Sequence, residues 1–303
     1  MRIIITGGTG LIGKALCPLL LTDRHLVTVL SRNPDETRGM PSGVSVEKWD
    51  GKTTEGWGHL VNSADAIINL AGAGVADRPW TAKRKQLIRE SRIQAGLAIQ
   101  KAIQQATQKP KVLVQASAVG YYGARHDDTI ITEEAAPGTD FLAKVCFDWE
   151  ISTAPVSKVG VRRPIIRTGV VLSRAGGAFP KMLLPFKFFA GGPLGDGKQW
   201  TPWIHITDQV RAIKFVLDNP RANGPFNLTA PNPVTNQQFS EILGATMRRP
   251  AFMPAPSIAM KTILGEMSTI LLDGQRVVPQ KLEQLGFTFT YPTLREALRN
   301  LMQ

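Results

Sequence analysis

Cysteine and long apolar runs are both scarce in this sequence. Cys17 and Cys146 are its only cysteines among 303 residues, and with the four histidines they form no cluster of metal-ligand spacing. Neither a disulfide-stapled secreted fold nor a structural zinc site is therefore expected. The apolar runs, such as residues 3–5, are far too short to span a membrane, so no membrane partner is expected. The chain opens directly on a strand-like run without a signal peptide, which predicts a cytoplasmic protein.

Acidic residues are also few, 24 against 36 basic ones, so the formal net charge is +12. Such a balance raises the question of nucleic-acid binding. The basic residues, however, come in short groups scattered along the chain, with no basic arm and no aromatic interleaving. We therefore expect no specific nucleic-acid partner, and a solvated surface that favours an anionic ligand.

The first half of the sequence alternates short apolar runs with longer amphipathic segments, which is typical of βαβ units. Several strand candidates are apolar throughout, as expected where helices cover both faces of a sheet. These candidates are residues 2–6, 26–31, 44–49, 66–70, 112–116 and 164–168. Helices are expected at 11–22, 81–107, 140–152 and 208–219. The pattern predicts an α/β fold with a Rossmann-type, doubly wound parallel sheet.

The composition of the sequence changes after about residue 169. Glycine and proline become dense from 176 to 202, which predicts a long excursion from the sheet, and amphipathic segments follow at 257–272 and 294–302. We expect a Rossmann domain over residues 1–168, to which 204–230 return in part. Residues 169–248 are expected to form a substrate lobe, and 249–303 a small C-terminal α/β domain.

A glycine-rich turn follows the first strand directly. Its sequence is Gly7-Gly8-Thr9-Gly10-Leu11-Ile12-Gly13, with glycines at every third position. The first glycine permits a tight turn, the second lets the backbone approach a pyrophosphate, and the third allows the helix to contact the strand. The positive end of the helix then faces the phosphates. Because the turn lies between a buried strand and a helix, it predicts a dinucleotide site rather than a plain turn.

The end of the second strand bears on which dinucleotide binds. An NAD site usually has Asp or Glu there to hold the ribose hydroxyls, whereas this chain has Ser31-Arg32. A guanidinium can hold a 2′-phosphate by paired charged hydrogen bonds, so NADP(H) is the expected cofactor, although a solvated arginine is the alternative. Asp50, after the third strand, is either an adenine contact or a turn residue.

With this turn in place, further motifs resemble the short-chain dehydrogenase/reductase superfamily in its extended, epimerase-like branch. Asn69-Leu70-Ala71-Gly72 resembles that superfamily's NAG motif after the fourth strand, and the segment from Ser117 to Gly123 its serine-to-YG motif. The segments 203–208 and 224–228 resemble the hinge motif and a substrate-lobe strand. The resemblance implies an NADP(H)-binding oxidoreductase or nucleotide-sugar-epimerase-like enzyme.

A closer similarity, covering nearly the whole chain, is to the YfcH-type subfamily. The stretches that carry it are 90–92, 141–150, 167–172 and 274–276, and 249–298 resemble that group's short C-terminal domain. The resemblance implies cofactor contacts by Ser31-Arg32, by the backbone of Leu70 and Ala71, and by Arg92 and Val170.

The departure from the family pattern concerns proton transfer. The superfamily uses Tyr-x-x-x-Lys, in which the lysine lowers the tyrosine pKa so that the phenol passes a proton during hydride transfer. Lys144 is present here, but Asp140 occupies the tyrosine position. Either Tyr121 or Tyr122 supplies the phenol beside Ser117 and Lys144, or Lys144 only anchors the cofactor. Aromatic packing is the alternative role for both tyrosines. Ser117 also lies one residue farther from Gly123 than the serine does in the superfamily's motif.

Two functions follow from these observations. The first is an NADP(H)-dependent oxidoreductase or epimerase acting on an unidentified small molecule. The second is a non-catalytic NADP(H)-binding sensor or regulatory protein. Whether the chain is an enzyme is left open by Asp140, and its oligomeric state is open too, with a homodimer as one alternative.

Overall fold

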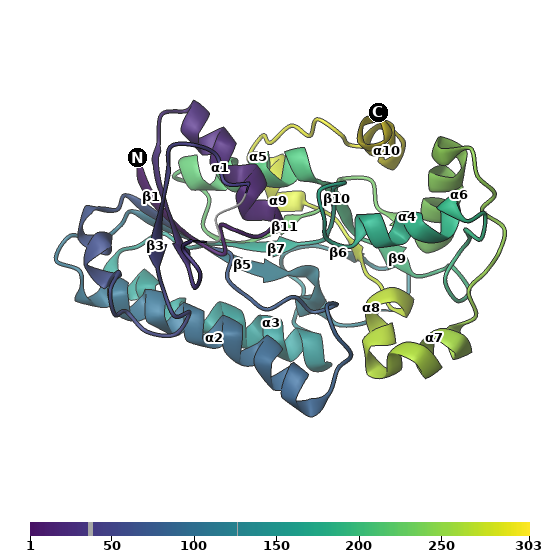
Figure 1. Cartoon of the computed structure of the whole chain (residues 1–303), viewed down its shortest axis with the longest axis horizontal. Coiled ribbons are helices and arrows are strands. Elements are labelled where there is room, and N and C mark those ends of the chain that lie inside the picture. Colours follow the sequence, from purple (N-terminus) through teal and green to yellow (C-terminus); the bar gives the residue numbers. More distant parts are fainter. Residues whose placement is uncertain (36–38, 126) are drawn as a thin grey trace.

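A parallel seven-stranded sheet forms the centre of the chain (Figure 1). The structure is a computed structural model, and it describes residues 1–35, 39–125 and 127–303. The strands follow the order β3-β2-β1-β4-β5-β7-β11, so the chain winds outward from β1 in both directions. Their bounds are β1 Arg2–Thr6, β2 Leu26–Ser31, β3 Val44–Lys48, β4 Ala66–Asn69, β5 Val112–Ala118, β7 Pro164–Thr168 and β11 Gly224–Leu228. The predicted doubly wound Rossmann-type sheet is confirmed.

Helices cover both faces of the sheet, as the fully apolar strands predict. On one face lie α1 (Leu11–Thr22) and α5 (Ile206–Asp218), which pack against each other (Figure 1). On the other lie α2 (Ala82–Gln105) and α3 (Phe141–Ile151), with the short 3-10 helices η1 (Gly58–Ser63) and η3 (Ala154–Val159) packed on α2. Alternate side chains of β1 and β4 therefore enter two separate cores, one on each face. Among the described residues, no helix has the length and apolar character needed to cross a membrane.

A second lobe extends from the carboxyl ends of β7 and β11. Its core joins α4 (Phe179–Lys187), α6 (Asn236–Met247) and the C-terminal helix α10 (Leu294–Met302) around Trp203 and Phe239. Short strand pairs flank this core. They are β8 (Val170–Leu172) with β10 (Trp203–His205), and β9 (Trp200–Thr201) with β12 (Val234–Thr235).

The chain after residue 249 packs against both lobes. Strand β13 (Arg276–Val277) pairs with β6 (Ile130–Ile131), and α9 (Gln280–Gln284) packs on β11. The amphipathic segment expected at 257–272 is helical but not one continuous helix. It is split into α7 (Ser257–Leu264), the 3-10 helix η4 (Gly265–Ser268) and α8 (Thr269–Leu272), because Gly265 takes a left-handed φ of +56°. Helices α4 and α6 had no counterpart in the sequence analysis.

The end of α1 yields a stability prediction. Arg24, exposed just beyond the helix, has a left-handed φ of +58°, and its amide donates to the carbonyl of Leu21 at 2.9 Å. A residue with a Cβ is strained there, whereas glycine is not. We expect Arg24→Gly to raise the free energy of unfolding by about 0.5–1 kcal/mol, measured by urea denaturation. Arg221→Gly, an exposed arginine without a positive φ, should give no gain.

Candidate functional site

The glycine turn between β1 and α1 is built as a cradle for an anionic group. Gly7 has a φ of +68°, and a Cβ on it would lie 2.6 Å from the carbonyl oxygen of Leu70. A Cβ on Gly13 would lie 2.4 Å from the Cα of Gly8, so the helix and the turn touch there. Gly10 is the N-cap and has no side chain with which to cap the first amides of α1. Those amides are left for a ligand, which is the arrangement that a pyrophosphate requires.

A chain of buried polar side chains fixes the strand ends beside this turn. The Oγ1 of Thr6 donates to Oδ1 of Asn69 at 2.7 Å, and Nδ2 of Asn69 donates to Oε1 of Gln115 at 3.0 Å. All three side chains are fully buried, and the amide of Ala71 also donates to Oδ1 of Asn69, at 3.3 Å. Asn69 therefore sets the direction in which residues 70–72 leave the sheet.

Helix α2 holds the same loop from the other side. The amide of Ala73 donates to Oγ of Ser91 at 3.1 Å, and the guanidinium of Arg92 donates to the carbonyl of Ala73 at 2.9 Å. Arg92 also lies over the ring of Trp149, 4.9 Å from its centroid, and burial lowers the pKa of its guanidinium. A Cβ on Gly72 would meet Arg92 at 3.0 Å. The motif 90–92 thus positions the loop that carries Leu70, Ala71 and Gly72.

The described residues at the end of β2, Ser31 and Arg32, include a cation and no acid. Arg32 is exposed, and Ser31 beside it accepts a hydrogen bond from the amide of Asn33 at 3.2 Å. Asp50 closes a turn, in which its Oδ1 accepts from the amides of Lys52 and Thr53 at 2.8 Å each. Of the two roles considered for Asp50, the turn is therefore observed. The guanidinium of Arg32 remains the charged group at this strand end.

The remaining cofactor candidates lie around the same edge. Thr9, Leu11 and Ile12 are half-buried in the turn and the first turn of α1. Val170, at the start of β8, is half-buried, and its amide donates to the carbonyl of Pro202 at 2.7 Å. The carboxyl ends of β1, β2 and β4 thus bring the glycine turn, Ser31 with Arg32, and the loop 70–72 to one edge of the sheet.

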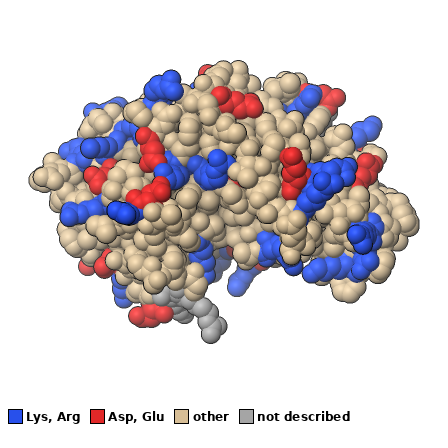
Figure 2. Space-filling model, turned by 90° about the horizontal axis from the view of Figure 1, so that it is seen from above, with Lys and Arg blue, Asp and Glu red and all other residues tan. Residues whose placement is uncertain are grey.

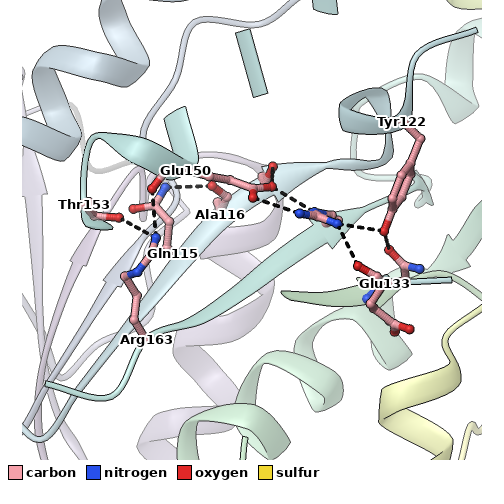
Figure 3. Close-up of polar contacts among 10 residues, drawn as sticks. Gln115, Ala116, Tyr122, Glu133, Glu150, Thr153 and Arg163 are labelled. Atoms are coloured by element: carbon pink, nitrogen blue, oxygen red, sulfur yellow. Dashed lines mark hydrogen bonds and ion pairs between the residues drawn. The ribbon is translucent and has the colours of Figure 1, made fainter. Parts of the chain in front are cut away.

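Beneath the carboxyl ends of β5 and β7 lies a buried ion pair that the sequence analysis missed (Figure 3). The guanidinium of Arg167 grips Glu150 through two hydrogen bonds, from Nε at 2.9 Å and from Nη2 at 3.0 Å. Burial works against the charge of Arg167, but its bonds and attraction to Glu150 raise its pKa overall. Both residues lie in stretches of the YfcH-type resemblance. The sequence signal for Arg167 was a lone charge in the apolar strand β7, whereas Glu150 is one of three charged residues of α3 and nothing in the sequence distinguished it.

Ser117 and Tyr122 belong to this network. The Oγ of Ser117 donates to Oε1 of Glu150 at 2.7 Å, and the hydroxyl of Tyr122 donates to Oδ1 of Asn227 at 2.6 Å while accepting from Arg167 at 3.1 Å. Tyr122 is fully buried, and burial raises the pKa of its phenol to about 12. Both hydroxyls are thus engaged in holding the strand ends together.

Tyr121 differs from its neighbour in its surroundings. Its ring is half-buried, and the Arg167 guanidinium lies 3.5 Å from the ring centroid. It also packs edge-to-face on Tyr122, with the two centroids 5.4 Å apart. Of the two tyrosines considered for proton transfer, Tyr121 is the one that is partly accessible.

The tyrosine position on α3 is occupied by a structural aspartate. Asp140 is the N-cap of α3, where its Oδ1 accepts from the amide of Ala143 at 2.9 Å. Its Oδ2 accepts from the amide of Ala124 at 2.9 Å, so each oxygen already has a partner. At the usual spacing from Gly123, the position of the family serine is Ala118, which has no hydroxyl.

Lys144 lies apart from the other three catalytic candidates. It is exposed on the side of α3 opposite Cys146 and Glu150, the residues that face β5. There it lines a surface hollow of about 450 Å³ with Arg89, Phe141 and Phe147. The structure therefore brings Ser117, Tyr121 and Tyr122 together around the Arg167–Glu150 ion pair, whereas the hollow that Lys144 lines includes none of these three.

The fold and the site together define a class of nucleotide-binding protein. The family model for the NAD dependent epimerase/dehydratase family matches residues 3–229, and a domain of unknown function, DUF1731, matches 255–301. The chain belongs to the NAD-dependent epimerase/dehydratase family. The predicted epimerase-like resemblance is thereby confirmed.

Two relatives align along the whole chain. The epimerase family protein YfhF of Bacillus subtilis is 40% identical over 100% of this chain and 98% of its own length. The crystal structure of the human epimerase family protein SDR39U1 with NADPH superimposes with a TM-score of 0.86 at 33% identity, covering 99% of each chain. The NADPH in that relative agrees with the cofactor expected from Arg32.

A third relative carries a more specific name. A nucleoside-diphosphate sugar epimerase from Corynebacterium glutamicum gives a TM-score of 0.79 at 35% identity, and the match covers 99% of this chain and 58% of that one. UDP-glucose 4-epimerase from Thermotoga maritima gives 0.80 at 17% identity and covers 96% of that chain, which shows the fold alone.

Proposed function

We propose that this chain is an NADP(H)-dependent oxidoreductase or epimerase of the YfcH type that acts on a small molecule. The observation that carries the proposal is the pairing of an uncapped helix start with Arg32 in the place of an acid at the end of β2. The first recognises a diphosphate, and the second recognises a 2′-phosphate. NADPH, the ligand of the human relative, has both groups.

The residues around the sheet edge would each hold a different part of the cofactor. The amides of Leu11 and Ile12 would face the pyrophosphate beside Gly10, whose own amide donates to the carbonyl of Gly7 at 3.0 Å, and Ser31 and Arg32 would face the adenosine ribose. The loop 70–72, fixed by Asn69 and Arg92, would line the cofactor between these contacts, with Val170 beyond them. When bound, the cofactor supplies a hydride for a carbonyl group or accepts one from a hydroxyl-bearing carbon. A nucleotide sugar is one substrate of that kind.

Proton transfer would not use the superfamily's tyrosine. Asp140 has both oxygens engaged, and Ser117 and Tyr122 are buried in the Arg167 network. Tyr121 and Lys144 remain as groups that solvent reaches. We infer that one of these two groups, or a water they hold, exchanges the proton at the substrate oxygen.

The test combines coenzyme titration with turnover. We expect calorimetry to detect NADPH binding, and a panel of carbonyl compounds and nucleotide sugars to include a substrate. Tyr121→Phe or Lys144→Ala, whichever removes the group that exchanges the proton, should lower kcat by about 10²–10⁴-fold while changing the Kd for NADPH little. Lys158→Ala, another exposed lysine, is the matched control and should leave both unchanged.

Two outcomes would overturn the proposal in different ways. NADPH binding without turnover of any compound on the panel would favour the sensor or regulatory role instead. If calorimetry detects no heat with either NADPH or NADH, the chain has no coenzyme site of the kind proposed.

A further inference from the structure

Exposed apolar side chains gather in two short segments, residues 181–192 and 247–263. Seven of the fourteen large apolar side chains that are exposed in the described chain lie there, and Phe188, Phe252, Ile258 and Ile263 are each at least 74% exposed. The other three are Leu184, Phe189 and Met253. Scattered apolar residues are ordinary on a protein surface, but a concentration of this kind marks an interaction site.

The two segments are joined in space, and we call them the apolar end. The amide of Met253 donates to the carbonyl of Gly191 at 3.1 Å, and Leu194 and Ala255 form a parallel bridge. The guanidinium of Arg249 lies over the ring of Phe189, 4.2 Å from its centroid. In Figure 1 the apolar end lies around α4, α6 and α7, at the extremity of the second lobe farthest from β1.

The backbone at Phe189 is strained without gaining burial. Its φ is +60°, a left-handed conformation that is rare for a bulky residue, yet the side chain is 56% exposed. Helix α7 has the sequence SIAMKTIL, and none of its residues is buried. Neither feature stabilises the folded chain by burying apolar surface, and a strained residue displayed to solvent is typical of a binding surface.

The charge at the apolar end has a single sign. Its two segments contain Lys181, Lys187, Arg248, Arg249 and Lys261 and no acidic residue, and all five basic side chains are exposed. In Figure 2 basic side chains lie at this end of the molecule as well as over the rest of the face. A second copy docked face to face would bring these like charges together, which disfavours self-association through this surface.

We propose that the apolar end docks on the surface of an anionic phospholipid membrane, with Phe188 and Phe189 entering the headgroup region. Aromatic and aliphatic side chains that project from the surface suit insertion between lipids, and the surrounding lysines and arginines suit anionic headgroups. Such docking requires no membrane-spanning segment. It replaces the expectation of no membrane partner with a contact at the membrane surface. It is independent of the coenzyme site.

The experiment is co-sedimentation of the full chain with vesicles of phosphatidylcholine, with and without about 30% phosphatidylglycerol. The wild type should bind the mixed vesicles, and about 0.5 M salt should weaken that binding. The double variant Phe188→Ser/Phe189→Gly should bind at least about tenfold less, because two apolar anchors are lost. Its Tm should not fall, because glycine relieves the left-handed backbone. A loss of vesicle binding without a loss of stability separates a docking role from a structural one.

Matched variants complete the test. Leu26→Ser removes an exposed apolar side chain elsewhere and should leave vesicle binding intact, whereas Lys187→Gln/Arg249→Gln should remove the preference for anionic vesicles. NADPH affinity, measured on every variant, reports separately on the coenzyme site. The proposal is overturned if the wild type binds neither vesicle, or if the phenylalanine variant binds as well as the wild type. The proposal would also be overturned if the wild type forms a concentration-dependent dimer that the phenylalanine variant does not form. The apolar end would then be an interface between two copies of this chain.

Discussion

Replacing Arg167 with methionine should reduce the free energy of unfolding by about 3–5 kcal/mol. The substitution keeps the volume of the side chain roughly but leaves Glu150 as a buried carboxylate without its cation. It also removes a donor from the hydroxyl of Tyr122. Urea denaturation at neutral pH measures the loss.

Two further variants show whether the charge itself is responsible. Ser117→Ala removes one hydrogen bond to Glu150 and should cost only about 1 kcal/mol. The double variant Glu150→Leu/Arg167→Met removes both charges and should recover much of the loss, since an apolar pair of similar volume leaves nothing unpaired. If Arg167→Met proves no more destabilising than Ser117→Ala, the ion pair does not hold the ends of β5 and β7.

Most of the sheet was predictable because strands such as β1, β4 and β7 are apolar runs bounded by turn residues. Strand β11 carries Pro225 and Asn227, so it was expected only by resemblance, as a strand of the substrate lobe, whereas it lies at the edge of the central sheet. Strands β1, β2 and β7 begin and end at the predicted residues, and so do α1 and α10. Helix α4 was missed because Pro180 and Pro185 lie within it, and the dense glycines that follow suggested an irregular excursion. Its apolar face is fixed by contacts with α6 and α10, which are distant in sequence.

The candidate site was predictable to a different degree in its two halves. The glycine turn and Arg32 depend on local spacing and on strand ends, so their positions follow from the sequence pattern alone. The Arg167 network depends on which face of α3 meets β5 and on a residue from β11, Asn227. Neither contact leaves a periodic pattern in the sequence. This is why Ser117, Tyr122 and Lys144 could be named but not placed relative to one another.

Arg32→Ala should weaken NADPH binding by about 10–150-fold, the equivalent of losing a charge-assisted hydrogen-bonded pair. NADH has no 2′-phosphate, so its affinity should change little, and the ratio of the two Kd values is the quantity to measure. Arg32→Asp should go further, because a carboxylate repels the phosphate and can accept hydrogen bonds from the ribose hydroxyls of NADH. Its preference should therefore move toward NADH.

Arg221→Ala is the control for general charge. Arg221 is exposed three residues before β11 begins, at the amino ends of the strands and thus at the opposite edge of the sheet from Arg32. Each substitution to alanine lowers the net charge by one, so a long-range attraction for an anionic coenzyme would weaken equally in both. A large NADPH-specific effect at Arg32 alone assigns the 2′-phosphate to the end of β2. Equal, small effects at both arginines would mean that the 2′-phosphate of NADPH binds away from the end of β2. The absence of an acidic residue at the end of β2 would then not explain a preference for NADP(H).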